Sequence, residues 1–272
     1  MQKLRNAARF RFRRIVLTGA GSGIGQALLE LLAAYSVQII AVDVDAEALE
    51  MVVGALRSAR AEITALTADI AGSENIDDLF RQALRIMGGV DLFIANAGFA
   101  YYEQIAEPDW QRIEQIYRVN VFSPIYAAAK MKTINSNRPY KVVITASAMA
   151  HLALPGYAIY ASTKAALHRF AEGYRFELDD PSTLTLVYPI ATHTNFFNAA
   201  ASRRIPMPWP TQSAQKVART IIAGIEHDQI SVYPSRLFAL FLILERFIPF
   251  LRSLIQAREQ WQFGRWIATG KK

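Results

Sequence analysis

The chain has 272 residues, a net charge of +7 at neutral pH and no cysteine. This length suits one large domain with a full core and is short for two. An apolar content of 52% excludes a disordered chain, and the lack of cysteine excludes disulfide bonds and thiolate metal sites.

A basic arm, residues 1–13, precedes the first predicted strand. The arm and the residue after it contain no acidic side chain and six basic ones: Lys3, Arg5, Arg9, Arg11, Arg13 and Arg14. No DNA- or RNA-binding motif accompanies these charges, so we expect a solvated arm and no nucleic-acid partner. Contact with anionic lipid head groups is the alternative. The arm runs into a strand without a cleavage-site pattern, which argues against a signal peptide and favours a cytoplasmic protein.

Short apolar runs alternate with amphipathic segments along the chain. The runs are residues 15–18, 37–42, 63–66, 92–94, 142–145, 184–187 and 230–233. The amphipathic segments are residues 25–35, 46–58, 76–87, 110–132, 157–179 and 214–227. Continuous β-branched runs are typical of strands buried on both faces of a parallel sheet. We therefore predict an α/β fold: one doubly wound Rossmann-type domain, residues 14–234, with about seven parallel strands and helices on both faces.

A glycine-rich turn follows the first predicted strand. It consists of Thr18, Gly19, Gly21, Ser22, Gly23, Ile24 and Gly25, with Ala20 among them. Gly19 permits a tight turn, Gly23 lets a pyrophosphate approach the backbone, and Gly25 allows the helix to pack closely on the strand. The N-terminus of that helix offers free N–H groups to phosphates. The turn therefore predicts a dinucleotide-binding site.

An acidic residue, Asp43, follows the second predicted strand. Its carboxylate can accept hydrogen bonds from the adenosine ribose and would repel a 2′-phosphate. No arginine or lysine lies between residues 41 and 56, and Ser22 stands where a basic residue could precede Gly23. We therefore predict NAD in preference to NADP.

Tyr160 and Lys164 lie four residues apart on a predicted helix, and Ser147 lies thirteen residues before Tyr160. Residues at i and i+4 share a helix face, so the Lys164 ammonium can lie beside the phenol and favour the phenolate. The Ser147 hydroxyl could bind the same substrate oxygen. The three side chains predict proton transfer at a carbonyl or hydroxyl group.

With these motifs in order, residues 14–233 resemble a short-chain dehydrogenase/reductase of the common ~250-residue type. The resemblance is also carried by Asp69 and Ile70 after the third strand, by Asn96, Ala97 and Gly98 after the fourth, and by Asn120. It implies an NAD(H)-dependent oxidoreductase that interconverts a secondary alcohol and a ketone by hydride transfer. It also implies a homodimer or homotetramer, in which the helices that bear Asn120 and Tyr160 pair between subunits.

The resemblance assigns catalytic roles to Asn120, Ser147, Tyr160 and Lys164. Tyr160 is expected to be the general acid in reduction and the general base in oxidation. Lys164 is expected to lower the pKa of Tyr160 and to bind the nicotinamide ribose. Ser147 is expected to bind the substrate carbonyl oxygen. Asn120 is expected to hold a water molecule of a proton relay that leads from Lys164 to solvent.

The residues after the sixth strand depart from the family pattern. The family favours Pro-Gly, whereas this chain has Pro189 followed by Ile190. Thr192 and Thr194 lie where the family binds the nicotinamide carboxamide. Ile190 therefore puts the local backbone in question. A second departure is Ala150, at a position where the family often has glycine.

A proline-rich stretch, residues 192–212, is predicted to be a substrate loop. The side chains expected to contact substrate are apolar or aromatic: Phe99, Leu154, Tyr157, Phe196 and Trp209. Such a lining favours a hydrophobic alcohol or ketone over a small charged substrate. His151 and His193 also fall near this rim and are interpreted as incidental.

The tail, residues 235–272, is predicted to be a helical extension rich in aromatic residues and arginine. Its longest apolar run, residues 237–244, is too short to span a bilayer. The tail could lie on a membrane surface, where the enzyme would act on a sphingoid, acyl or steroid-like lipid. Alternatively, it could contact a second subunit or cover the pocket. An alternative of another class is a non-catalytic regulatory protein that binds NAD.

Overall fold

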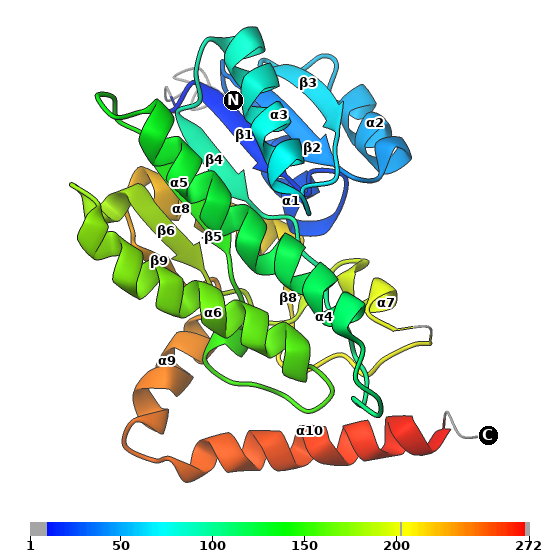
Figure 1. The fold of residues 1–272 in the computed structure, drawn as a ribbon. Helices are drawn as coiled ribbons and strands as arrows, with labels where there is room; N and C mark the ends of the chain where they lie inside the picture. Colours follow the sequence, from blue (N-terminus) through cyan, green and yellow to red (C-terminus); the bar gives the residue numbers. More distant parts are fainter. Residues whose placement is uncertain (1–9, 202, 270–272) are drawn as a thin grey trace, which may run out of the picture.

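The computed structural model describes residues 10–201 and 203–269, so most of the predicted basic arm, residues 1–9, lies outside the described residues. The core is a seven-stranded sheet in the order β3-β2-β1-β4-β5-β6-β9, in which every neighbouring pair is parallel (Figure 1). Its strands are β1 (Arg14–Thr18), β2 (Gln38–Asp43), β3 (Glu62–Thr67), β4 (Leu92–Ala95), β5 (Lys141–Thr145), β6 (Leu184–Val187) and β9 (Ser231–Val232). The predicted α/β fold is confirmed, together with its C-terminal helical extension.

Helices cover both faces of the sheet and bury its continuous apolar runs. One apolar core includes side chains of α1 (Gly23–Leu32), α2 (Ala46–Ala55) and α8 (Ala214–Glu226). The core of the opposite face includes side chains of α3 (Ser73–Met87), α5 (Ser123–Ile134) and α6 (Ala158–Tyr174), which lie in front of the sheet in Figure 1. The strand order reverses between β1 and β4. In such sheets a ligand crevice forms at the carboxyl ends of the strands beside that reversal.

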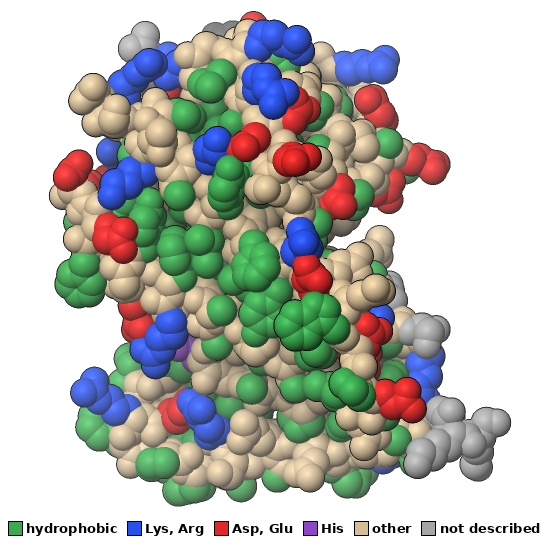
Figure 2. Space-filling model, viewed as in Figure 1, with side chains coloured by type: hydrophobic (Ala, Val, Ile, Leu, Met, Phe, Trp, Pro, Cys, Tyr) green, Lys and Arg blue, Asp and Glu red, His purple; other side chains and the backbone are tan. Residues whose placement is uncertain are grey.

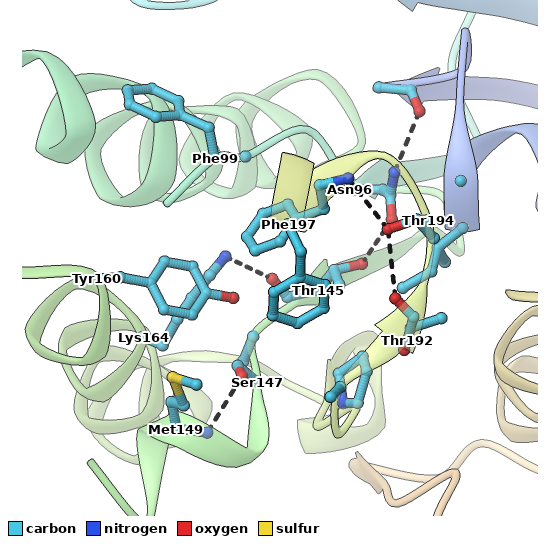
Figure 3. A pocket seen from close by; sticks show the side chains of 18 of the residues that line it. Asn96, Phe99, Thr145, Ser147, Met149, Tyr160, Lys164, Thr192, Thr194 and Phe197 are labelled. Atoms are coloured by element: carbon cyan, nitrogen blue, oxygen red, sulfur yellow. Dashed lines mark hydrogen bonds between the residues drawn. The ribbon is translucent and has the colours of Figure 1, made fainter. Parts of the chain in front are cut away.

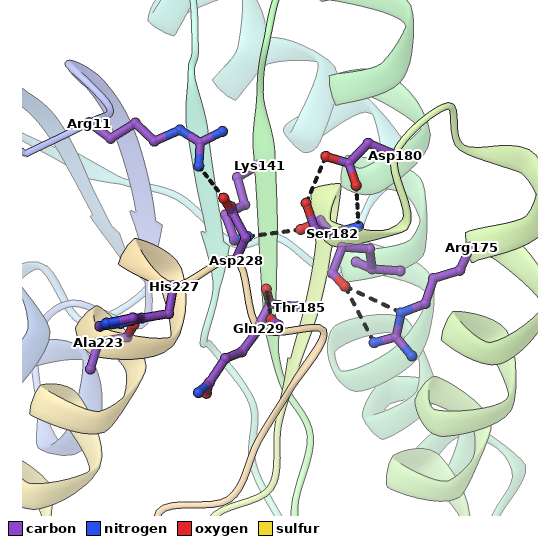
Figure 4. A network of polar contacts seen from close by, with 11 residues as sticks. Arg11, Lys141, Arg175, Asp180, Ser182, Thr185, Ala223, His227, Asp228 and Gln229 are labelled. Atoms are coloured by element: carbon purple, nitrogen blue, oxygen red, sulfur yellow. Dashed lines mark hydrogen bonds and ion pairs between the residues drawn. The ribbon is translucent and has the colours of Figure 1, made fainter.

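A polar network lies at the amino ends of the strands, where β5 begins. The buried ammonium of Lys141 lies 3.0 Å from an Asp228 carboxylate oxygen and donates to the Ser182 carbonyl at 2.8 Å (Figure 4). Arg11 pairs with the same carboxylate, so this residue of the basic arm is tied to the loop between α8 and β9. A buried ammonium is tolerated when it has such partners. We therefore expect these contacts to stabilise the fold at the amino ends of the strands.

The helix predicted at residues 110–132 is interrupted. It consists of α4 (Trp110–Tyr117), a π-helical turn at Arg118–Phe122, and then α5. Pro124 explains the interruption, because it has no N–H group to donate to the carbonyl of Asn120 four residues earlier. The π-turn therefore places Asn120 at a break in the α-helical hydrogen-bond pattern.

The predicted loop at residues 192–212 is closed by a small structure that the sequence did not predict. β7 (Thr192–His193) and β8 (Gln212–Ser213) pair in parallel, and α7 (Phe196–Ala199) lies between them. Strands of two residues are too short to show a hydrophobic period.

The tail forms α9 (Arg236–Glu245) and α10 (Phe250–Thr269). Figure 1 shows α10 crossing below α4 and α6. Across the part of the chain that the structure describes, none of the helices is both long and apolar enough to cross a membrane.

Candidate active site

A cavity of about 1080 Å³ opens at the carboxyl ends of the central strands. Most residues that the sequence predicts for cofactor, catalysis or substrate line it: Thr18, Gly19, Ser22, Gly23, Ile24, Asp43, Asp69, Ile70, Asn96, Ala97, Gly98, Phe99, Ser147, Leu154, Tyr157, Tyr160, Lys164, Pro189, Thr192, Thr194, Phe196 and Trp209. The other members of that set, Gly21, Gly25 and Asn120, lie behind the cavity wall. The sheet thus brings together side chains that are far apart in the sequence.

Two glycines of the turn are required by close contacts. A Cβ atom added to Gly25 would lie 1.7 Å from the Gly19 carbonyl oxygen, so α1 can pack this closely on the turn only with glycine there. Gly23 has a φ of +56°, and an added Cβ atom would lie 2.9 Å from the Thr194 side chain. The turn therefore packs tightly at the N-terminus of α1, where N–H groups without an intrahelical partner are suited to a phosphate group.

The Asp43 carboxylate is fixed by two backbone N–H groups. One of its oxygens accepts from Gly21 at 2.8 Å, and the other accepts from Asp45 at 3.1 Å. Each carboxylate oxygen keeps a further lone pair that could accept from a ribose hydroxyl. Among the described residues that line the cavity, Arg112 and Lys164 are the cationic ones, and neither belongs to the glycine turn or to β2.

A chain of hydrogen bonds links the glycine turn to the lysine (Figure 3). The Asn96 amide donates to the carbonyls of Thr18 and Gly19 at 3.3 and 3.2 Å. Its oxygen accepts from the Thr145 hydroxyl at 3.2 Å, and the Thr145 carbonyl accepts from the Lys164 ammonium at 2.9 Å. The ends of β1, β4 and β5 thereby hold the turn and the Lys164 side chain in one fixed geometry.

Tyr160 and Ser147 face the same space in Figure 3. Burial raises the pKa of Tyr160 to about 12, and a hydrogen bond with Ser147 opposes part of that rise. Burial lowers the pKa of Lys164 to about 8. The Lys164 ammonium lies 5.6 Å from the centre of the phenol ring and donates to the Thr145 carbonyl. Desolvation of the phenol is therefore the largest influence on the pKa of Tyr160, and the effect of Lys164 on that pKa stays a prediction.

Asn120 is buried, and its side chain supports the cavity wall from behind. Its amide nitrogen donates to the Phe99 carbonyl at 2.9 Å and to the Thr163 hydroxyl at 3.2 Å. Its amide oxygen accepts from the Phe99 N–H at 3.1 Å. The side chain is thus fully engaged. A Cβ atom added to Gly98 would lie 2.9 Å from the Asn120 amide oxygen and 3.5 Å from the Lys164 nitrogen, so both groups border the same small space.

The departure at Ile190 does not distort the backbone. Asp228 alone among the described non-glycine residues has a positive φ, so Ile190 occupies a conformation open to β-branched side chains. Its carbonyl accepts from the Thr192 hydroxyl at 2.8 Å, and the Pro189 carbonyl accepts from the Ala148 N–H at 2.8 Å. The threonines remain at the cavity wall.

The two rim histidines lie outside the cavity. His151 packs against Tyr188 and His168, and burial lowers the pKa of His151 to about 4. His193 is exposed and its ring nitrogen lies 2.9 Å from the Thr211 hydroxyl. Both positions agree with their interpretation as incidental.

The cavity wall also contains residues that the sequence did not single out. They are Arg112, Thr145, Met149, Leu237, Phe238, Phe241, Ile255 and Glu259, among others. The last five belong to α9 and α10, so the extension covers the cavity, as one of the three alternatives for the tail supposed. Spacing could have revealed the covering face of α10, because Ile255, Glu259 and Phe263 follow one another at intervals of four residues.

Comparison with known proteins identifies the family. The model of the family described as short chain dehydrogenase matches residues 13–204. The chain belongs to the short-chain dehydrogenase family. The predicted family and enzyme class, NAD(P)-dependent oxidoreductases that act on CH–OH groups, are thereby confirmed.

Relatives within the short-chain dehydrogenases differ in substrate and cofactor. 1-Deoxy-11-beta-hydroxypentalenate dehydrogenase of Streptomyces exfoliatus is 31% identical over 172 residues, which are 61% of this chain and 62% of that one. A structure from Burkholderia phymatum in complex with NAD superposes with a TM-score of 0.79 at 23% identity, over 90% of this chain and 96% of that one. A dehydrogenase from Sphingobium yanoikuyae in complex with NADPH gives a TM-score of 0.76 at 22% identity, over 89% of this chain and 95% of that one. The two structures show the same fold with either nucleotide.

Proposed function

We propose that this short-chain dehydrogenase interconverts a secondary alcohol and a ketone on a hydrophobic substrate, with NAD(H) as its cofactor. The observation that carries the proposal is the meeting of Ser147, Tyr160 and Lys164 at one cavity wall, linked by hydrogen bonds to the glycine turn. No other arrangement in the described chain combines a proton carrier with a nucleotide cradle.

The residues present fit a dinucleotide. The glycine turn, of which Gly19, Ser22 and Gly23 line the cavity, suits the pyrophosphate at the N-terminus of α1. The fixed Asp43 carboxylate suits the adenosine ribose and disfavours a 2′-phosphate, which supports NAD. Asp69, Ile70 and the residues after β4 would border the adenine and ribose. Pro189, Thr192 and Thr194 would border the nicotinamide.

Each catalytic side chain has a role that its surroundings support. When bound, the nicotinamide supplies or accepts the hydride. With a pKa raised to about 12, Tyr160 is protonated at neutral pH and can donate its proton to a substrate carbonyl oxygen. Ser147 would donate a hydrogen bond to the same oxygen. Lys164, with a pKa lowered to about 8, would bind the nicotinamide ribose and exchange a proton near neutral pH.

Asn120 would continue the proton path through its backbone. Its side chain is engaged with Phe99 and Thr163, whereas Pro124 leaves its carbonyl without an α-helical donor. A water molecule on that carbonyl could receive a proton from Lys164, whose nitrogen borders the space beside Gly98 together with the Asn120 side-chain oxygen. The relay is thus assigned to the carbonyl of Asn120.

The substrate end of the cavity is apolar and aromatic. Phe196 packs edge-on against Tyr160 with 5.6 Å between ring centres, and Phe99, Leu154 and Trp209 border the same space. This lining supports a bulky hydrophobic alcohol or ketone.

A Tyr160→Phe variant tests the proposal. We expect turnover of a panel of hydrophobic ketones with NADH to fall by at least two orders of magnitude, while the dissociation constant of NADH stays within about twofold. A Tyr174→Phe variant removes the hydroxyl group of a tyrosine that lies in the same helix but outside the cavity, and is the matched control. Full turnover in Tyr160→Phe would refute the assignment. Tight NADH binding without turnover by the unaltered protein would favour the regulatory alternative.

The exposed surface of the extension supports a second candidate, a membrane-surface enzyme with a lipid-type substrate. Large apolar side chains of α9, α10 and their connection face solvent: Leu237, Leu240, Ile243, Leu244, Phe247, Ile248, Phe250, Leu254 and Trp261. Exposed arginines such as Arg236 and Arg246 border them. A surface of this kind suits the interface of an anionic membrane.

Vesicle flotation tests that candidate. We expect binding to vesicles that contain phosphatidylserine, and a loss of at least about tenfold in the Phe247→Glu, Phe250→Glu double variant. Phe176→Glu changes an apolar side chain that is 92% exposed at the end of α6, and we expect no effect from it. Equal binding by all three proteins, or none by any, would refute the candidate.

We also propose a homodimer. Hydrophobic side chains gather over α4, α5 and α6 in the middle of the face shown in Figure 2, and Trp110 and Phe122 are exposed on α4 and the π-turn. A subunit contact on these helices is also what the family resemblance implies. Light scattering of a Phe122→Glu variant tests this, and an unchanged dimer would contradict it.

A further inference from the structure

The inward face of α10 contains one acidic residue in an otherwise apolar row. Ile255, Glu259, Phe263 and Trp266 share this face. Phe263 and Trp266 pack edge-on against Tyr102, with ring centres 5.4 and 4.8 Å apart. Ile255 and Glu259 line the cavity itself. The aromatic contacts therefore fix α10 in a position that presents the Glu259 carboxyl group to the substrate space.

Glu259 is 7% exposed, and within residues 10–201 and 203–269 no hydrogen bond or ion pair to its carboxyl group is present. The other glutamate of the extension, Glu245, differs because it pairs with Arg252. Neither oxygen of Glu259 is among the fully enclosed unpaired atoms of the described residues, so the carboxyl group reaches the cavity, where a substrate group can bind it. Burial also raises the pKa of Glu259.

A second polar group without a partner lies on the same wall. The Tyr157 hydroxyl is buried and makes no hydrogen bond to the described residues. Tyr157 packs on Tyr102 with 4.7 Å between ring centres, and the charge of Glu259 is among the causes that raise the pKa of Tyr157 and of Tyr102. Tyr157 also lies one helical turn before Tyr160, with 6.3 Å between ring centres. Tyr157 therefore lies between Tyr160 and Tyr102, the residue on which α10 packs.

We propose that Glu259 and Tyr157 form a polar subsite that binds a second hydroxyl group of the substrate. The inference rests on the proposed function, since it concerns the substrate of the same cavity. A hydroxyl fits both partners, because it donates to the Glu259 carboxylate and accepts from the Tyr157 phenol. An ammonium group can only donate, so it offers no acceptor to the hydroxyl hydrogen of Tyr157. The substrate is thus an apolar ketone or alcohol that carries a hydroxyl group on the side that faces α10.

The subsite gives the extension a role in specificity. A site that hydrogen-bonds a substrate hydroxyl rejects the analogue that lacks it, because its own buried polar groups are then left unpaired. The glycine turn and the catalytic side chains set the reaction, whereas a residue of the C-terminal helix selects the substrate.

Matched ketones provide the test. The probes are medium-chain methyl ketones and the same ketones with a hydroxyl or an amino group at successive carbons. For the unaltered protein we expect kcat/KM for the best hydroxyketone to exceed that of the plain ketone by about tenfold or more. In Glu259→Leu the preference should vanish or reverse, and Glu259→Gln, which retains polar atoms, should be intermediate. Gln260→Leu makes a similar change on the exposed side of α10 and should keep the preference.

A binding measurement separates this inference from the proposed function. The affinity of each ketone for the Tyr160→Phe protein with NADH, read from nucleotide fluorescence, needs no turnover. Loss of hydroxyketone preference on adding Glu259→Leu supports the subsite even if no ketone is reduced. An equal preference with and without Glu259 would overturn it, and so would stronger binding of the aminoketones. Failure of every ketone to turn over, with the preference intact, would count against the proposed function alone.

Discussion

Replacement of the catalytic lysine by methionine should stabilise the fold while it removes activity. Lys164 is 4% exposed, and burial lowers its pKa from 10.5 to about 8. Each pKa unit corresponds to about 1.4 kcal/mol, so the charged lysine destabilises the folded state by about 3 kcal/mol at neutral pH. Methionine has a similar length and no charge. The variant loses the 2.9 Å hydrogen bond from the charged ammonium to the Thr145 carbonyl, which is worth about 2 kcal/mol, so the net gain is about 1 kcal/mol.

The gain should depend on pH in a defined direction. Below the folded pKa of about 8, Lys164 is charged in both the folded and the unfolded protein, and the full penalty applies. As pH rises from about 8 to 10.5, the folded protein releases the proton first, so the penalty disappears. Above that range the unaltered protein should be the more stable one, because it keeps the hydrogen bond to Thr145.

Urea unfolding of both proteins, at neutral pH and above pH 10, measures the difference. A Lys141→Met variant is the control, because Lys141 is equally buried but is paired with Asp228 at 3.0 Å. We expect that variant to be less stable at neutral pH. If Lys164→Met were also less stable, with the same pH dependence as the unaltered protein, the burial argument would be wrong. The turnover of Lys164→Met should fall by at least two orders of magnitude.

Three further variants probe the turn, the nucleotide preference and the acid response. Gly25→Ala puts a Cβ atom 1.7 Å from the Gly19 carbonyl, so we expect a large loss of thermal stability and no NADH binding, measured by calorimetry. Asp43→Asn removes a charge that would face a 2′-phosphate, so the ratio of NADPH to NADH dissociation constants should fall by about tenfold or more; an unchanged ratio would contradict the role of Asp43. The pKa of His151 is lowered to about 4, so the unfolded protein binds its proton first and stability falls between about pH 6.5 and 4. His151→Gln should reduce that fall, as seen in melting temperatures across this range.

The fold could be predicted because strands buried on both faces leave a clear signal. Runs such as residues 142–145 are continuous and β-branched, and each is followed by a helical period. The site followed from the same signal, because parallel strands bring the residues after them to one edge of the sheet. Thr18, Asn96 and Ser147 could therefore be placed together before their contacts were known.

Features set by tertiary contacts could not be predicted in this way. The sequence places Lys164 one turn after Tyr160, but spacing does not show that the ammonium turns to the Thr145 carbonyl or that burial dominates the pKa of Tyr160. The π-turn depends on Pro124, whose missing N–H group is visible in the sequence but whose effect on the neighbouring helix is not. Both features depend on which groups lie next to each other in the folded chain, which spacing along the sequence does not give.

The role of Glu259 becomes visible only when the sequence and the structure are considered together. The sequence places this residue in an arginine-rich tail, where a glutamate would ordinarily lie on a solvated helix face. The structure instead turns this face of α10 inward, against Tyr102, and leaves the carboxyl group in the cavity wall. A leucine would serve packing alone, whereas a carboxyl group that reaches the cavity can bind a substrate group. The same residue therefore links the covering role of the tail to the choice of substrate.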